Sequence, residues 1–257
     1  MTITQILFTD PESRGQPLPP PLIAATQSVK AAFEDHAYEL FDLPKARQLI
    51  AAHFGDRVLN SFDALKPYAY KSDLARYCIL HQQGGWYVDI GLKFMHSIRA
   101  SVEADLIAFA DRGCPSCAPW AIQNGLFYAK AKSPILASAI EAVCHNVERQ
   151  YYGASPLDPT GPNLFGKLIS QQADGQTCIF GEFKPLTPGL SFSNLMYLSS
   201  SGYLIAQHKT SWAPGLEGGD FSKLGVQGTN NYKELWQDRK STRLNSSHAN
   251  TRMPSSA

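Results

Sequence analysis

The chain has 257 residues, of which 44% are hydrophobic and 18% are charged, and its formal net charge is +1. This length and composition predict one globular domain with a sizeable core, or one domain plus a small subdomain, and the near-neutral charge argues against nucleic acid as the main partner. No run of about 18 apolar residues occurs, so no transmembrane segment is predicted.

Hydrophobic periodicity and turn residues predict the elements along the chain. Strands are expected at 3–8, 38–41, 86–90, 92–95, 105–110 and 125–129. Helices are expected at 22–36, 44–54, 72–83, 134–151 and 162–172, with 134–151 the longest. Residues 178–206 have strand and turn character. Because strands and helices alternate in the first half, we predict an α/β fold with a mixed, mostly parallel sheet and helices on both faces.

The folded domain is expected to cover residues 1–240. Residues 241–257 contain Ser, Thr, Asn and Arg with almost no apolar residue. Such a composition cannot bury enough surface to fold. We expect this tail to be disordered or foreign to the natural protein.

The five cysteines are scattered along the chain, which favours a reducing compartment. The N-terminus has no basic segment followed by an apolar one, so it does not resemble a secretion signal. We therefore expect a cytoplasmic protein, with peripheral attachment to the inner face of the membrane as the other option. Cys114 and Cys117 form a lone C-x-x-C pair. We interpret it as a loop, because structural zinc would need a second pair at suitable spacing.

The segment from Tyr70 to Gly91 is the most informative part of the chain. It predicts a helix, a glycine break and a strand that ends on Asp89. On the helix, Asp73 and Arg76 are three residues apart, so their side chains can meet. One interpretation is a surface ion pair on a helix; the other is a polar pocket, because ligands of such sheets bind outside the carboxyl ends of the strands.

This segment resembles the sugar-binding signature of the glycosyltransferases with a DXD motif, a family 32-like group similar to the catalytic domains of clostridial glucosylating toxins. The matching positions share fixed spacing with that signature and are Ser72, Asp73, Arg76, Tyr77, Gly84, Gly85, Tyr87 and Asp89. Gly91 stands where the family has the second aspartate of the motif. Further matches follow in family order and include 3–8, 38–42, 123–129, 133–136, Thr160-Gly161-Pro162, His208 and Ser211-Trp212.

The resemblance implies a GT-A-like fold and a hexosyltransferase that takes its sugar from a UDP- or GDP-sugar, with retention of anomeric configuration. It implies catalytic roles for Asp73, Arg76 and Asp89, of which the first two would hold donor hydroxyls. The substrate-binding residues that it implies are Ser72, Tyr77, Gly84, Gly85, Tyr87, Asn124, Ser211 and Trp212. The resemblance further implies polysaccharide or glycoconjugate synthesis, and it leaves the acceptor open as a carbohydrate, a lipid-linked sugar or a protein.

Several of these residues have a structural interpretation as well. His208 is either a site residue or a structural hydrogen-bonding residue, and Trp212 either closes over the diphosphate or packs in the core. Asn124 either faces the pocket or satisfies buried backbone. Asp42, after the second strand, either caps the next helix or contacts the nucleotide.

A divalent cation, Mn²⁺ or Mg²⁺, would neutralise charge on the leaving diphosphate. We predict Asp89 and His208 as its ligands, since Gly91 removes the family's usual carboxylate. The alternatives are an enzyme that relies on Lys or Arg near the phosphates, or a degenerate protein that binds a sugar nucleotide without turnover. A nucleotide-sugar hydrolase, which would use water as the acceptor, is a further alternative.

Overall fold

The computed structural model describes residues 1–98, 103–113, 117–187, 194–213, 216 and 218–239. The predicted tail 241–257 and Cys114 lie outside the described residues, and no disulfide forms among the four described cysteines. No helix in the described part of the chain combines the length and apolarity needed to cross a bilayer.

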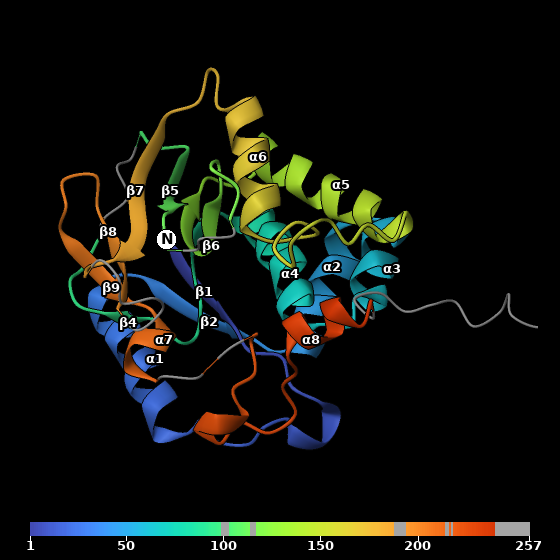
Figure 1. The fold of residues 1–257 in the computed structure, drawn as a ribbon, viewed down its shortest axis with the longest axis horizontal. Helices are drawn as coiled ribbons and strands as arrows, with labels where there is room; N and C mark the ends of the chain where they lie inside the picture. Colours follow the sequence, from blue (N-terminus) through green and yellow to red (C-terminus); the bar gives the residue numbers. More distant parts are fainter. Residues whose placement is uncertain (99–102, 114–116, 188–193, 214–215, 217, 240–257) are drawn as a thin grey trace, which may run out of the picture.

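One nine-stranded sheet organises the described fold, with the strand order β2-β1-β3-β6-β5-β7-β8-β9-β4 (Figure 1). The strands are β1 (Thr2–Ile6), β2 (Ala37–Phe41), β3 (Gly85–Val88), β4 (Lys93–Phe94), β5 (Leu106–Asp111), β6 (Ile122–Ala129), β7 (Cys178–Pro185), β8 (Leu195–Leu198) and β9 (Leu204–Gln207). The helices are α1 (Pro20–Ala32), α2 (Leu43–His53), α3 (Asp56–Ala64), α4 (Tyr68–Gln83), α5 (Pro134–Glu148), α6 (Pro162–Gln172), α7 (Lys209–Trp212) and α8 (Tyr232–Gln237), with 3-10 turns η1 (Pro11–Ser13) and η2 (Ser222–Leu224).

The sheet is mixed, but the prediction that it is mostly parallel is wrong. Among the described strands, β1 pairs in parallel with β2 and β3, and β5 pairs in parallel with β7. The other five ladders are antiparallel: β6 runs opposite to its neighbours β3 and β5, and β9 runs opposite to its neighbours β8 and β4, as β8 does to β7. Strand direction depends on long-range pairing, which a local sequence pattern does not contain.

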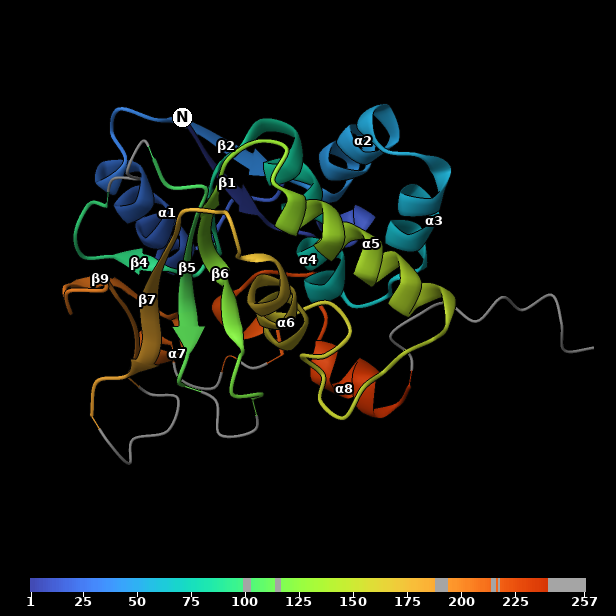
Figure 2. The same ribbon diagram turned by 90° about the horizontal axis from the view of Figure 1, so that it is seen from above.

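Helices cover both faces of the sheet, as predicted. Figure 2 shows α1 on one side of the strands and α2 to α6 on the other. Val29 of α1 and Phe33, which directly follows the helix, pack against Ile3, Trp86 and Val88 of the sheet. The larger apolar cluster lies on the opposite face and includes residues of α2 to α6.

The five predicted helices all appear, but α1 ends at Ala32 instead of 36 and α5 at Glu148 instead of 151, and α3, α7 and α8 were not predicted. Helix α4 begins at Tyr68, four residues before the predicted start, and its 16 residues make it longer than the 15-residue α5. Helix α3 was not predicted, because Asn60, Ser61 and Asp63 are weak helix formers. Tertiary contacts stabilise it instead, since its Phe62 is completely buried in the larger cluster.

Gly84 and Gly85 end α4 and start β3, as the glycine break predicts. Both have positive φ values, 67° and 105°. At Gly85 a Cβ would lie 2.3 Å from the backbone oxygen of Thr2, so the close pairing of β3 with β1 also needs glycine. This turn sets the direction in which β3 carries the chain to Asp89.

Candidate active site

The polar residues of the signature meet at one edge of the sheet. The parallel strands β1, β2 and β3 all end there, and Asp89 directly follows β3. Because β6 is antiparallel to β3, the beginning of β6 lies at the same edge. The backbone N–H of Asp89 donates to Gly125 O at 2.7 Å, which places Asn124 beside the end of β3.

Arg76 is the centre of this group. Its guanidinium lies 3.2 Å from Asp73 and 3.4 Å from Asp89, and it donates to Asn124 O at 2.6 Å. It also donates to Ser72 O at 3.1 Å and lies over the ring of Tyr87, 4.2 Å from the centroid. A planar fork with several donors suits such a convergent set of acceptors.

Asp73 is saturated by protein partners. Its Oδ1 accepts from the side-chain amide of Asn124 at 2.9 Å, and its Oδ2 accepts from the hydroxyl of Thr160 at 2.6 Å. Burial raises the pKa of the Asp73 carboxyl, whereas Arg76 and the hydrogen bond from Thr160 act in the opposite direction. Asp73 and Arg76 are only 7% and 5% exposed, so the interpretation as a surface ion pair is wrong.

Asp73, Arg76 and Asp89 form a charged group, of which Asp89 is the partly exposed member, with 25% of its side chain accessible to solvent. Its Oδ1 accepts from the hydroxyl of Tyr87 at 2.7 Å. A Cβ on Gly125 would lie 2.8 Å from Asp89 Oδ2 and 3.0 Å from the hydroxyl of Tyr197, so both atoms border one small space that glycine leaves open. The buried Tyr197 hydroxyl has no hydrogen-bond partner among the described residues.

Aromatic packing fixes α4 behind this group. The ring of Tyr77 stacks on Phe165 at 5.3 Å, and Phe165 contacts Phe127 of β6 at 5.1 Å. Each such pair stabilises by about 0.5–1.5 kcal/mol beyond its buried area. The Tyr77 hydroxyl donates to Thr160 O at 3.0 Å and accepts from the amide of Asn124, so Tyr77 supports the site from the core.

Two predicted site residues lie elsewhere. Gly84 and Gly85 are at the start of β3, the opposite end of the strand from Asp89, where they make the turn. Their predicted contact with the substrate stays a prediction, and they lie away from Asp89. Ser72 is half-buried on α4 beside Asp73, and its predicted contact with the donor stays a prediction.

The C-terminal motif residues follow β9, which ends at the same edge. His208 caps α7: its Nδ1 lies 2.8 Å from the Thr210 hydroxyl, and its ring contacts Phe183. Burial lowers the pKa of His208, and the charge of Lys209 lowers it further, which favours a neutral imidazole. These contacts agree with the structural interpretation of His208.

Ser211 and Trp212 lie in the short helix α7. The hydroxyl of Ser211 donates to Leu195 O at 3.0 Å. The indole N–H of Trp212 donates to Gly91 O at 3.1 Å, and its ring packs in the small apolar cluster that includes Ile90. Trp212 therefore has the packing role, and its predicted closure over a diphosphate stays a prediction.

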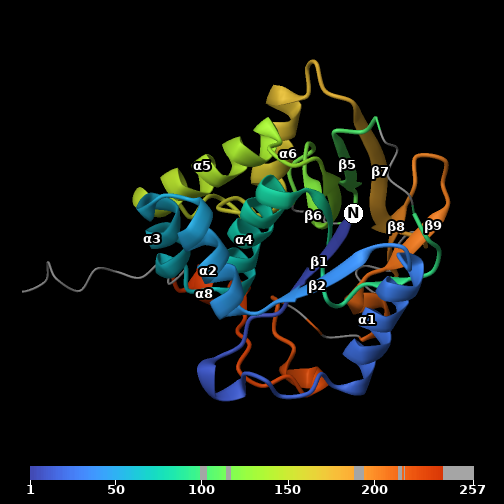
Figure 3. The same cartoon turned by 180° about the vertical axis from the view of Figure 1, so that it is seen from behind.

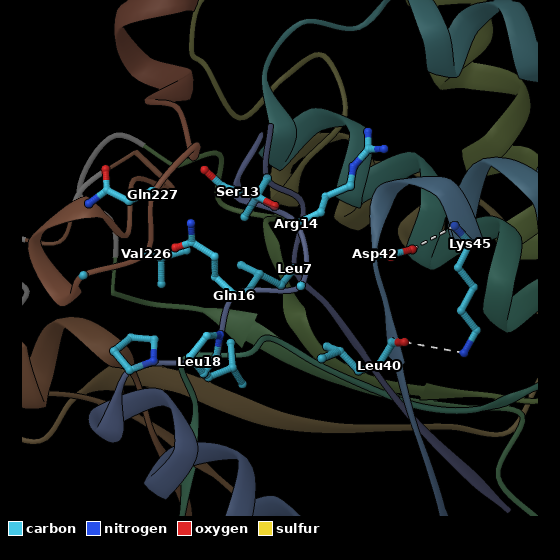
Figure 4. Close-up of a pocket in the computed structure, with 15 residues that line it drawn as sticks. Leu7, Ser13, Arg14, Gln16, Leu18, Leu40, Asp42, Lys45, Val226 and Gln227 are labelled. Atoms are coloured by element: carbon cyan, nitrogen blue, oxygen red, sulfur yellow. Dashed lines mark hydrogen bonds between the residues drawn. The ribbon is translucent and has the colours of Figure 1, made fainter. Parts of the chain in front are cut away.

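A cavity of about 350 Å³ opens at the same edge, beyond the ends of β1 and β2. Its lining comes from the chain after β1, the start of α2 and the turn after η2, and consists of Leu7, Thr9, Ser13, Arg14, Gly15, Gln16, Pro17, Leu18, Pro19, Leu40, Asp42, Lys45, Gly225, Val226 and Gln227. Figure 4 shows Asp42 and Lys45 opposite Val226 and Gln227. Asp42 caps α2 by accepting from the Lys45 N–H at 2.9 Å, so it has the capping role and also lines the cavity.

The two chain segments that form the far wall of the cavity lie side by side below the sheet (Figure 3). The N–H of Asp10 donates to Gly228 O at 2.9 Å, which ties the segment after β1 to the turn after η2. A C-terminal segment thus completes a wall that the N-terminal half begins.

The family comparison agrees with this geometry: the model of the glycosyltransferase sugar-binding region containing a DXD motif matches residues 21–108, which include α4, β3 and Asp89. Residues 21–108 of the chain therefore match a glycosyltransferase sugar-binding region. No curated protein matches it.

One solved structure supports the fold class, and two further glycosyltransferase structures align less well. The PaToxG glycosyltransferase aligns with a TM-score of 0.51 at 15% identity, covering 68% of this chain and 69% of that chain, and confirms the predicted GT-A-like α/β fold class. A glycosyltransferase involved in the glycosylation of the major capsid of PBCV-1 aligns at 0.34 with 8% identity, covering 71% and 82%. The apo form of mouse xyloside xylosyltransferase 1 aligns at 0.36 with 10% identity, covering 68% and 83%.

Glycosyltransferases with a DXD motif generally use divalent cations, but the donors near Asp89 do not fit one. Within the ranges that the structure describes, no three His, Cys, Asp or Glu side chains gather closely enough to hold a metal ion. Asp89 Oδ1 already accepts from Tyr87 and faces Arg76, and His208 Nδ1 is engaged by Thr210. The predicted Asp89 and His208 metal site is therefore not supported by the described residues.

Three residues of this glycosyltransferase site were not predicted. Thr160 lies in a loop whose Thr-Gly-Pro motif was visible in the sequence, but the sequence gives no indication that its hydroxyl contacts Asp73. Tyr197 lies in an ordinary apolar strand, without any sequence signal. Lys209 lies between the predicted His208 and Ser211, and its charge interacts with Asp89 and Arg76.

Proposed function

We propose that this glycosyltransferase takes its sugar from a nucleoside diphosphate sugar, a UDP- or GDP-sugar, with the nucleoside in the 350 Å³ cavity and the sugar beside Asp89. The observation that carries the proposal is that the cavity and the charged group lie at one edge of the sheet, past the ends of β1, β2 and β3. In α/β sheets, ligands bind in this position.

An apolar cluster connects the two parts of the proposed site. Ile90, one residue after Asp89, packs in the same cluster as Val226, and Leu7 and Leu18 pack against that cluster. The last three of these residues line the cavity. A ligand that extends from the cavity toward Asp89 would therefore cross one continuous surface.

We infer different roles for Asp73, Arg76 and Asp89 from how much of each side chain is exposed. Asp89 is partly exposed, with 25% of its side chain accessible, and borders the small space beside Gly125, so it is our candidate for the carboxylate that accepts hydrogen bonds from sugar hydroxyls. The Tyr197 hydroxyl borders the same space and would otherwise remain without a partner. Asp73 and Arg76 are buried, and they act as positioning residues that fix Asp89 and the end of β3.

The reaction breaks the bond between the anomeric carbon and a diphosphate oxygen, and that oxygen keeps the electron pair. The acceptor hydroxyl oxygen forms the new bond to the anomeric carbon, and its proton passes to the leaving diphosphate. We expect retention of anomeric configuration and an acceptor in polysaccharide or glycoconjugate synthesis. The cytoplasmic location stays a prediction.

The test is incubation of the purified protein with a panel of UDP- and GDP-sugars, with separation of the products by chromatography. We expect release of UDP or GDP from at least one donor, and a loss of about 100-fold or more in Asp89→Asn, because a charge-assisted contact in the transition state is removed. Asp63→Asn, at an exposed carboxylate paired with Arg47, is the matched control and should retain activity.

Other outcomes separate the alternatives. Hydrolysis that continues at the same rate when acceptors are added would assign a nucleotide-sugar hydrolase. Ligand-induced thermal stabilisation without product would assign a binding protein without turnover. Absence of both binding and turnover with every donor would refute the proposal.

A further inference from the structure

Lys209 is the one cationic side chain of α7 and lies at the same edge of the sheet as Asp89. It follows β9 directly, after the His208 cap. Burial lowers the pKa of Lys209, Asp89 raises it and Arg76 lowers it, so its ammonium lies within electrostatic range of both charged residues. Lys209 forms no ion pair with a described carboxylate, and its charge therefore has capacity for a bound anion.

The position of Lys209 depends on the glycine at 91. A Cβ on Gly91 would lie 2.8 Å from Cβ, 3.1 Å from Cδ and 3.4 Å from Cγ of Lys209. The lysine stem thus passes directly over the α-carbon of Gly91. Any side chain at position 91, an aspartate included, would displace it.

The ammonium of Lys209 also lies between the two halves of the proposed donor site. Its Nζ is 5.3 Å from the ring centroid of Phe221. Phe221 belongs to the apolar cluster that includes Val226, a residue of the cavity wall. Lys209 also interacts electrostatically with Asp89, beside which the sugar would lie. The diphosphate of a sugar nucleotide connects these two places.

We propose that Lys209 supplies the positive charge that stabilises the leaving diphosphate, in place of a divalent cation, and that Gly91 is the residue that makes room for it. The proposal rests on the proposed function, because it names the group that faces the diphosphate of that donor. It accounts for two observations together: the absence of a carboxylate at 91 and the absence of a metal-ligand cluster among the described residues.

The chemistry requires only that the charge be close when the bond breaks. As the anomeric carbon–oxygen bond lengthens, negative charge grows on the diphosphate, and a fixed ammonium stabilises that charge without a metal. Lys209 keeps its protons throughout, since the acceptor proton goes to the diphosphate. Lys209 thereby faces the leaving group, whereas Asp89 faces the sugar.

The test measures UDP and GDP binding by isothermal titration calorimetry in EDTA and in Mn²⁺, for the wild type, Lys209→Met, Lys209→Arg and Lys223→Met. Lys223 is an exposed lysine of η2 and serves as the matched control. We expect wild-type affinity to be the same in EDTA and Mn²⁺. We expect Lys209→Met to weaken diphosphate binding by about tenfold or more, the effect of one lost charge-assisted contact, with partial recovery in Lys209→Arg.

Uridine and guanosine, which lack phosphate, provide the second readout. We expect Lys209→Met to bind the matching nucleoside within about twofold of wild type, because a nucleoside has no phosphate for Lys209 to contact. A merely structural role would instead weaken the binding of both ligands alike. The double variant Gly91→Asp with Lys209→Gly should bind the diphosphate only when Mn²⁺ is present. This variant restores the carboxylate and removes the stem that blocks it.

Two results would overturn the inference while leaving the proposed function intact: loss of wild-type UDP and GDP binding in EDTA, or unchanged diphosphate affinity in Lys209→Met. If the wild type binds neither UDP nor GDP under any condition, the proposed function fails and the inference fails with it. Equal weakening of nucleoside and diphosphate binding in Lys209→Met would assign Lys209 a structural role.

Discussion

Replacing Arg76 with methionine tests whether the buried charges hold the site together. The change removes the donor to Asn124 O at 2.6 Å and both contacts to Asp73 and Asp89. Removing one partner of a buried pair costs about 3–5 kcal/mol, because the other charge stays buried. Asp73 keeps its hydrogen bonds from Asn124 and Thr160, so we expect the lower end, about 3 kcal/mol at neutral pH.

The stability loss in Arg76→Met should depend on pH, because it involves the pKa of Asp73. Burial already raises the pKa of Asp73, and Arg76 opposes that rise. Without Arg76 the pKa of Asp73 rises further, so the folded state binds a proton that the unfolded state has released. Stability is then lost as pH rises from the ordinary carboxyl pKa toward the raised value, and it is regained as pH falls. The difference between wild type and Arg76→Met should therefore shrink from pH 8 to pH 5.

The assay is urea unfolding followed by circular dichroism at pH 8, 6.5 and 5. Arg47→Met is the matched control, because Arg47 also pairs with an aspartate, Asp63, but both side chains are exposed. Surface pairs of this kind contribute little, so the control should stay close to wild type. The reasoning is refuted if both variants lose the same stability, or if the cost of Arg76→Met grows as the pH falls.

Two further changes separate side-chain chemistry from backbone geometry. Thr160→Val should lower the free energy of unfolding in urea by about 1–3 kcal/mol, because Asp73 Oδ2 loses its buried donor. Thr160→Ser keeps the hydroxyl and should stay near wild type. Equal loss in both variants would show that the methyl group matters instead. Gly85→Ala should lower the melting temperature far more than Gly175→Ala. Both glycines have positive φ, so the backbone strain is shared. A Cβ at Gly85 would lie 2.3 Å from Thr2 O, whereas a Cβ at Gly175 would have nothing within 4 Å. Similar losses would indicate that φ alone decides.

The local part of the site could be predicted from the sequence. The i, i+3 spacing of Asp73 and Arg76, the glycine break and the strand ending at Asp89 all appear in the structure. These features depend on periodicity and backbone sterics, which neighbouring residues determine. The sequence did not predict that this ion pair is buried, because its partners Asn124 and Thr160 lie far along the chain.

Helix α3 shows the same limit within the fold. Its sequence contains weak helix formers, and its stability comes mainly from the burial of Phe62 in the core. On its exposed side, Arg57 pairs with Glu141 and Glu148 of α5. Those partners are more than 80 residues away. Tertiary contacts override a weak local propensity here.

The sequence by itself determined which residues of α4 and β3 could meet, the α/β class and the glycosyltransferase signature, because short-range spacing sets each of these. Only the tertiary structure decided the direction of β6, the cavity beyond β1 and β2, and the contact of the Lys209 stem with the α-carbon of Gly91. The physical reason is that strand direction and side-chain burial depend on pairings between distant segments, and nothing in the local sequence encodes which distant residue will fill the space that a glycine leaves open.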